Sequence, residues 1–278
     1  ELTAVHQQFF HMIALRKWGE PDILARVSSV DREDFQNAMQ IIDLLVERKF
    51  AIKLEADSFA PGSDPASILR AELRMERRLA EVIGATRVTG SSSLARVARA
   101  AAPRSSYREW LEARVPDARD EDPRTGADRQ TGELLTSLIA LAEQAMLHAF
   151  LFRHLRRPDE ADNAWRLSGA AMLYLRALVA CLLASGSGSP ELHLPEMSMG
   201  ATSSEAFEAD MSLARRCGGL AVLAARTISD RQMRDICLRI GNDCELIASM
   251  RMADDFPAVF GRSPAFESFA ATCVRHLG

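Results

Sequence analysis

Apolar residues recur at three- and four-residue steps along most of the chain, which is the spacing of one face of an α-helix. In the first half the pattern predicts helices at 1–18, from about 29 to 55, at 65–83 and, more weakly, at 94–115. In the second half it predicts helices at 133–156, 160–185, 203–227 and 230–252. We therefore expect an all-α chain whose two halves each contain four helices, with the longest connection between the second and third.

A polar stretch rich in Asp, Arg, Pro and Gly separates the two halves. We expect a first bundle at 1–116, a linker at 117–132, a second bundle at 133–252 and a C-terminal tail at 253–278. Three short matches support a duplication. Residues 71–78 recur at 209–216, residues 37–39 at 170–172, and Phe10-His11 lies opposite Leu147-His148, at offsets of 138, 133 and 137.

Composition restricts the function classes. With 47% apolar and 26% charged residues the chain is typical of a globular protein, and a net charge of −4 argues against nucleic-acid binding. The five cysteines lie in the second half without a C-x-x-C pair, which favours reduced thiols. No apolar run reaches the roughly 18 residues of a membrane span, and no signal peptide is visible, so we expect a cytoplasmic protein. The sequence opens inside a helical pattern, with no capping residue before Glu1.

Several segments carry a resemblance to a known family. The run Glu1-Leu2-Thr3-Ala4-Val5-His6-Gln7-Gln8-Phe9-Phe10-His11, followed by Trp18-Gly19, resembles the first helix of bacterioferritins. Residues 67–76 and 109–112 resemble the third helix and the end of the fourth, and residues 134–149 and 205–250 resemble the same helices again. The resemblance implies two ferritin-like four-helix bundles in tandem, with the long crossover between second and third helices that this fold has.

The resemblance also implies a di-iron site, which would take a Glu from each of two helices and a Glu-x-x-His pair from each of the others. In the first copy Glu1 and Glu76 match, and Asp34 and Asn37 stand for the second-helix pair. Arg104 and Tyr107 replace the fourth-helix pair, so we expect Arg104 to form an ion pair with Glu76, Glu1 or Asp34 in place of iron.

The remaining candidates are weaker. Glu72, one turn before Glu76, is a further candidate ligand for iron in the first copy. In the second copy the ligand positions fall on Leu138, Leu167, Ala170, Ala214, Asn242 and Glu245, which predicts a packed core. Met39 and Met172 lie one turn beyond the positions of the family's haem ligands, Phe35 and Ser168, and most simply fill space in a core or an interface. The histidines on helices, including His11 and His148, are expected to be packed or at the surface.

These residues lead to one expectation and two alternatives. We expect a degenerate bacterioferritin-like protein that acts as a structural or interaction subunit, without ferroxidase activity and without a cofactor. It would bind a protein partner, a second copy or ferritin-like subunits, and neither nucleic acid nor a membrane. One alternative is iron binding or oxidase chemistry in the first copy, using Glu1, Asp34, Glu72 and Glu76. The other is a haem or cofactor carrier between the copies, using Met39 and Met172.

Overall fold

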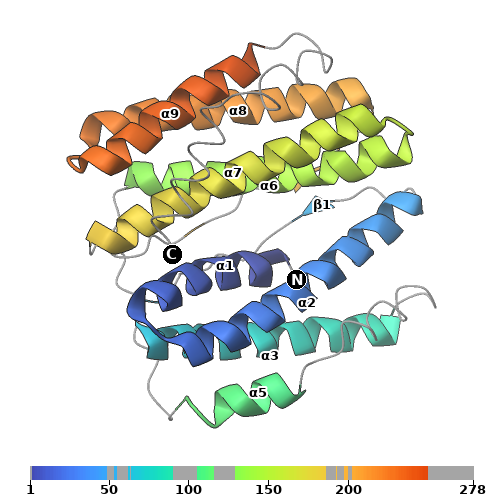
Figure 1. The fold of residues 1–278 in the computed structure, drawn as a ribbon. Helices are drawn as coiled ribbons and strands as arrows, with labels where there is room; N and C mark the ends of the chain where they lie inside the picture. The colour runs from blue at the N-terminus through green and yellow to red at the C-terminus, as the bar shows by residue number, and fades with distance from the viewer. Residues whose placement is uncertain are drawn as a thin grey trace. The chain divides into compact units, whose positions relative to one another are not determined.

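The chain is all-α, as the hydrophobic pattern predicts (Figure 1). The computed structural model describes residues 2–48, 53–54, 62, 64–89, 105–115, 129–185, 192, 197–199 and 202–249. Within these ranges it has eight helices: α1 (Leu2–Trp18), α2 (Pro21–Glu47), α3 (Pro65–Thr89), α5 (Ser105–Glu112), α6 (Arg129–His154), α7 (Pro158–Ser185), α8 (Ser203–Thr227) and α9 (Arg231–Ala248). Two short strands, β1 (Lys53–Leu54) and β2 (Met197–Ser198), pair antiparallel.

The chain divides into two compact units. The first contains residues 1–44 and 59–126, and the second contains 45–58 and 127–278. The division at 126 falls inside the predicted linker at 117–132, but α6 begins at Arg129, so the end of that segment is helical. The segment 45–58 belongs to the second unit although it lies in the first half of the sequence. The tail predicted at 253–278 lies outside the described residues.

The first unit contains the largest errors of the helix prediction. Helix α2 begins at Pro21 and not near residue 29, because Gly19 turns the chain with a φ of 73° and a proline suits the first position of a helix. It ends at Glu47, before the predicted end at about 55. Helix α5 covers Ser105–Glu112 of the weak helix predicted at 94–115, and residues 90–104 lie outside the described residues.

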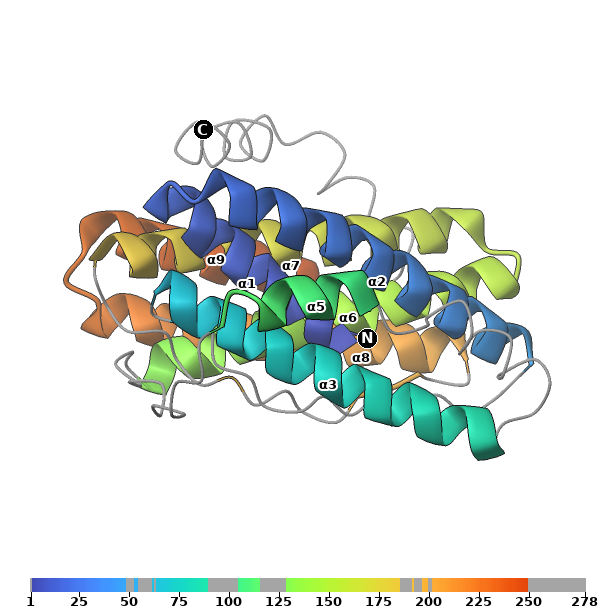
Figure 2. The same ribbon diagram turned by 90° about the horizontal axis from the view of Figure 1, so that it is seen from below.

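A small apolar core joins the helices of the first unit. Helix α3 packs against α1 and against α5, which lies along it (Figure 2). Side chains from α2, α3 and α5 form one buried cluster: Val30, Leu69, Leu73, Tyr107 and Leu111. The start of α3 is fixed by a reciprocal cap in which Ser67 N–H donates to Asp64 Oδ1 at 2.8 Å and Asp64 N–H donates to Ser67 Oγ at 3.0 Å.

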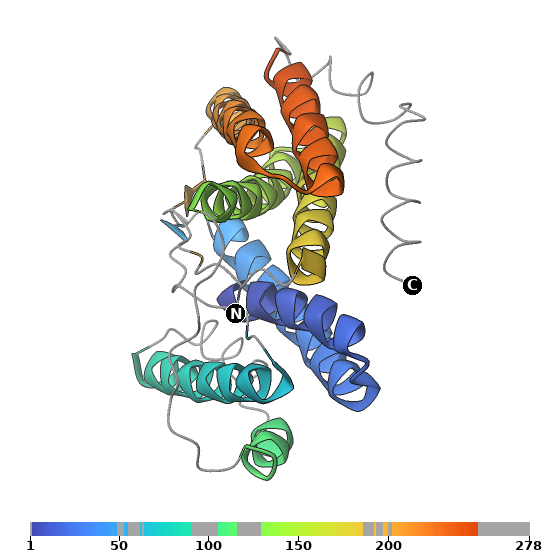
Figure 3. The same cartoon turned by 90° about the vertical axis from the view of Figure 1, so that its left-hand side faces the viewer.

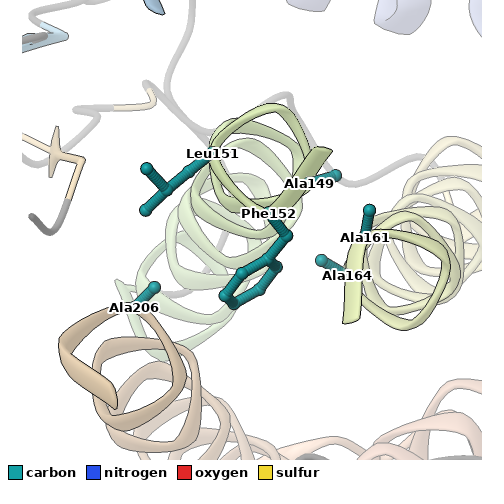
Figure 4. Close-up of a cluster of buried hydrophobic side chains, with 6 residues drawn as sticks. All are labelled: Ala149, Leu151, Phe152, Ala161, Ala164 and Ala206. Atoms are coloured by element: carbon teal, nitrogen blue, oxygen red, sulfur yellow. The ribbon is translucent and has the colours of Figure 1, made fainter. Parts of the chain in front are cut away.

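Among the residues that the structure describes, four long helices form most of the second unit. Helix α6 packs on α7 and α8, and α9 packs on α8 and α7, so the four surround a common core (Figure 3). At one end of that core Phe152 of α6 lies between the small side chains Ala161 and Ala164 of α7 and Ala206 of α8 (Figure 4). Burial of such apolar side chains contributes about 25 cal/mol per Å² removed from water and is the main source of stability in a helical core.

Two helices of the second unit resemble membrane spans in length and composition. Helices α6 and α7 each contain an apolar 18-residue window of this kind, although the sequence analysis predicts no span. A core helix of a soluble protein has the same character, and 94% of the α6 window is buried in the protein, against 56% of the α7 window. These helices are therefore weak evidence for a membrane, and the absence of a span stays a prediction.

Candidate functional site

A histidine–carboxylate pair is buried inside the first unit. His11 of α1 and Glu72 of α3 are 0% and 1% exposed, and His11 Nδ1 lies 2.6 Å from Glu72 Oε1. A carboxylate oxygen can only accept, so Nδ1 carries the proton and donates it to Glu72. The ring orientation of His11 is therefore set by a residue 61 positions away in the sequence.

Tyr107 of α5 engages the second oxygen of the same carboxylate. Its hydroxyl donates to Glu72 Oε2 at 2.9 Å, so both oxygens of Glu72 accept hydrogen bonds from protein groups. The Tyr107 ring stacks on Trp110 with centroids 5.8 Å apart, and the guanidinium of Arg26 lies 5.7 Å from its centroid. The network therefore links α1, α3 and α5, and Arg26 adds α2 through a cation–π contact.

Two aspartates of α2 extend this polar interior. Asp34 is fully buried and accepts a hydrogen bond from Gln8 Nε2 at 2.9 Å. Burial, together with the charges of Asp34 and Glu72, raises the pKa of the half-buried Asp31 from 3.8 to about 6, while His6 and Arg32 oppose the shift. The negative charges of Asp34 and Glu72 thus disfavour ionisation of Asp31, and the positive charges of His6 and Arg32 offset this effect only in part.

The second unit contains a corresponding pair. His148 of α6 and Asp210 of α8 are 0% and 4% exposed, and His148 Nδ1 lies 2.8 Å from Asp210 Oδ1. Burial raises the pKa of Asp210, and the bond with His148 and its charge oppose this shift. On the other side of the ring, Gln144 Nε2 lies 3.0 Å from His148 Nε2.

The two pairs occupy equivalent positions in the sequence repeat. His148 follows His11 by 137 residues and Asp210 follows Glu72 by 138, which are the offsets of the matched segments. The sequence analysis treated both histidines as packed or surface residues and missed their partners. The signal was present, because a histidine on the first helix and an acid on the third recur in the second half at nearly the same offset.

The predicted iron ligands fall partly inside this region. Asp34, Glu72 and Glu76 all belong to the first unit and are at most 5% exposed. Glu1 and Arg104 lie outside the described residues, so the ion pair between Arg104 and Glu76 stays a prediction. Across the part of the chain that the structure describes, no three or more His, Cys, Asp or Glu side chains are arranged to hold a metal ion.

Four of the six second-copy positions are buried as predicted, and two are exposed. Leu138, Leu167, Ala170 and Ala214 are buried, as predicted for a packed core. Asn242 and Glu245 are exposed, whereas the alignment placed them on the bundle axis. The buried face of α9 instead carries Ile240, Gly241 and Cys244, because α9 packs through its small and apolar residues.

The remaining candidates have ordinary surroundings. Met39 on α2 and Met172 on α7 are half-buried and belong to different units, so a haem site on them stays a prediction, which an absorption spectrum would test.

Cys181, Cys217, Cys237 and Cys244 are free thiols, as the sequence predicts. Burial raises the pKa of Cys237 and of Cys244 to about 12, which makes both poor nucleophiles.

Comparison of the chain with models of protein families, with curated proteins and with solved structures found no match. A functional proposal for this chain therefore rests on the arrangement of its residues.

Proposed function

We propose that the chain is a structural or interaction protein, built on two ferritin-like four-helix bundles in tandem, that does not oxidise iron. The observation that carries this proposal is the network of His11, Glu72 and Tyr107, in which both oxygens of a candidate ligand already accept protein hydrogen bonds. Two of the roughly four lone-pair sites of the Glu72 carboxylate are thus used by buried hydrogen bonds within the protein, so this carboxylate is a weaker candidate ligand than one without such bonds. The pair His148–Asp210 extends the pattern to the second unit.

The charge and chemistry of the remaining positions support the same proposal. By the alignment, Arg104 and Tyr107 replace an iron-binding pair on the fourth helix. Arginine stays protonated and cannot ligate a cation. At an effective dielectric near 20, unit charges about 4 Å apart repel by about 4 kcal/mol, and the repulsion doubles for a divalent ion. Without an iron site, the simplest role for the helical scaffold is to bind a protein partner or a second copy of the chain. The buried reduced thiols are consistent with a cytoplasmic location.

The deciding experiment is aerobic oxidation of iron(II) by the purified protein, followed by absorbance and combined with metal analysis. We expect oxidation at the rate of the buffer alone and iron well below one ion per chain. The double variant Arg104→Glu, Tyr107→His restores two ligands and should bind more iron than the unmodified protein. Saturable turnover by the unmodified protein that Glu76→Ala abolishes would overturn the proposal.

One observation favours iron binding in the first unit as a second candidate. Asp34, Glu72 and Glu76 are all buried in the same unit, and buried carboxylates need protons or cations to offset their charge. This candidate predicts about one tightly bound iron per chain, lost in Glu72→Gln and Glu76→Gln. Retention of the same iron content in both variants would eliminate it.

The state of assembly tests the interaction part of the proposal. Light scattering across a range of protein concentrations should give a mass above that of the 30.6 kDa chain if the protein assembles with itself. A monomer at all concentrations would leave a different protein as the partner.

A further inference from the structure

Buried polar atoms without a hydrogen-bond partner gather on two helices of the first unit. On α1 these atoms are Gln7 Nε2, Gln8 Oε1 and His11 Nε2, and on α2 they include Asp31 Oδ1. Gln7 is 4% exposed and His11 is 0% exposed, so bulk solvent does not reach either side chain. Native proteins rarely leave such groups unsatisfied, and a bound molecule is a common reason when they do.

The second unit provides a like-for-like comparison. Gln7 and His11 are four residues apart on α1, and Gln144 and His148 are four residues apart on α6, at an offset of 137. In the second unit the two side chains meet directly, with Gln144 Nε2 at 3.0 Å from His148 Nε2. In the described part of the first unit neither Gln7 Nε2 nor His11 Nε2 has a hydrogen-bond partner, although His11 Nδ1 is bonded to Glu72 as His148 Nδ1 is to Asp210.

The two atoms define what can bind between them. Gln7 offers amide N–H donors. Because Nδ1 of His11 carries the proton that Glu72 accepts, Nε2 is the accepting nitrogen in the tautomer with a single ring proton. A small molecule that both accepts and donates satisfies the two groups together, whereas an anion or a bare cation satisfies only one of them. Water has this character and is the usual occupant of polar sites inside proteins.

We propose that Gln7 and His11 form a binding site for one internal water molecule in the first unit, and that the second unit lacks this site because Gln144 bonds directly to His148. Gln8 Oε1 and Asp31 Oδ1 are further buried acceptors on the same two helices. The interior of the first unit is then hydrated, while the equivalent position of the second unit is dry.

The matched substitutions Gln7→Leu and Gln144→Leu test the proposal in the full-length chain. If water is bound, Gln7→Leu removes one of its partners and leaves His11 Nε2 bare, so the melting temperature falls by a few degrees. If no water is bound, Gln7→Leu removes a desolvated amide and the melting temperature rises, which would overturn the proposal. Gln144→Leu lowers the melting temperature in either case and is the positive control.

A direct measurement keeps the test decisive if a variant does not fold. In the unmodified protein, magnetisation transfer from a long-lived water should reach the Gln7 side-chain amide by nuclear magnetic resonance, and none should reach that of Gln144. A crystal structure should show density at hydrogen-bonding distance from both Gln7 Nε2 and His11 Nε2. Absence of the transfer, or empty density at that position, would show that the site is dry and that the proposal is wrong.

Discussion

At the scale of single residues, each unit has a buried histidine that a carboxylate on another helix holds in place: Glu72 holds His11, and Asp210 holds His148. The periodic pattern placed His11 and His148 on helices but did not indicate which residues face them. Their partners lie 61 and 62 positions away, on helices whose rotation about their own axes no local pattern specifies. The buried carboxylates Asp34, Glu72 and Glu76 were identified from the resemblance, but the hydrogen bonds to Gln8 and Tyr107 were not predicted.

Breaking the second-unit pair should strongly destabilise the protein. His148→Ala leaves Asp210 buried without its partner, and such a loss typically costs about 3–5 kcal/mol. A double-mutant cycle of His148→Ala and Asp210→Ala, measured by denaturant unfolding, should give a coupling of at least about 1 kcal/mol. If the free-energy cost of the double variant equals the sum of the two single costs, the two side chains contribute independently and the prediction is wrong. The same cycle on His11 and Glu72 is the matched experiment for the first unit.

The pKa of Asp31 makes the stability of the first unit depend on pH. Because that pKa is raised from 3.8 to about 6, the folded state disfavours the ionised carboxyl, so the penalty is absent below about pH 4 and complete above about pH 6. Asp31→Asn cannot ionise and should stabilise the protein by about 1 kcal/mol at pH 7.5, after allowing for solvent screening at a half-buried site.

The same substitution should have little effect near pH 4, as thermal unfolding at both pH values would show. Asp43→Asn, at an exposed position of the same helix, is the control and should change stability little at either pH. An equal gain from Asp31→Asn at pH 4 and pH 7.5 would contradict the assignment.

At the scale of elements, the helices whose ends carry strong local signals were predicted well. The bounds of α8 match the prediction, and a capping box of Thr202 and Glu205 marks its start. The start of helix α2 was predicted too late, near residue 29, because the helical pattern of apolar residues is weak there, whereas Pro21 suits the first position of a helix. The residues Lys53–Leu54 were assigned to a helix, but they pair with Met197–Ser198, a partner that no local pattern reveals.

The contact between α8 and α9 depends on two glycines. A Cβ at Gly241 would lie 2.9 Å from Val222 Cγ2, and a Cβ at Gly218 would lie 3.1 Å from Cys244 Cβ. Gly241→Ala should therefore destabilise the second unit by about 1–3 kcal/mol, because overpacking forces the helices apart.

A neighbouring glycine provides the control for this prediction. A Cβ at Gly219 meets nothing within 4 Å, so Gly219→Ala should stabilise by up to about 1 kcal/mol through helix propensity alone. Val222→Ala should rescue part of the cost of Gly241→Ala in chemical denaturation. Stabilisation by all the glycine substitutions would show that α8 and α9 are not in close contact.

At the scale of the whole molecule, the all-α class and the division near residue 126 follow from periodicity and composition. Neither periodicity nor composition predicts that the segment 45–58 belongs to the second unit. Elements that follow one another along the chain through short connections usually lie next to one another in space. The position of the segment 45–58 instead depends on the pairing of β1 with β2, which are far apart in the sequence. Helix α9 shows the same limit, because the alignment fixed its place in the order of helices but not its rotation about its axis.

The segment 45–58 has a consequence for how the chain can be divided. A fragment that begins at Ala127 retains all four helices of the second unit but lacks β1, so β2 is left with an open edge beside the buried Met197. We expect this fragment to aggregate more readily than the full chain, and a synthetic peptide of residues 45–58 added in trans to raise its melting temperature. A peptide with Leu54→Pro should not, and equal effects of both peptides would contradict the pairing. A cut between residues 126 and 127 therefore does not separate the two units cleanly, because a segment from the first half of the sequence forms part of the second unit.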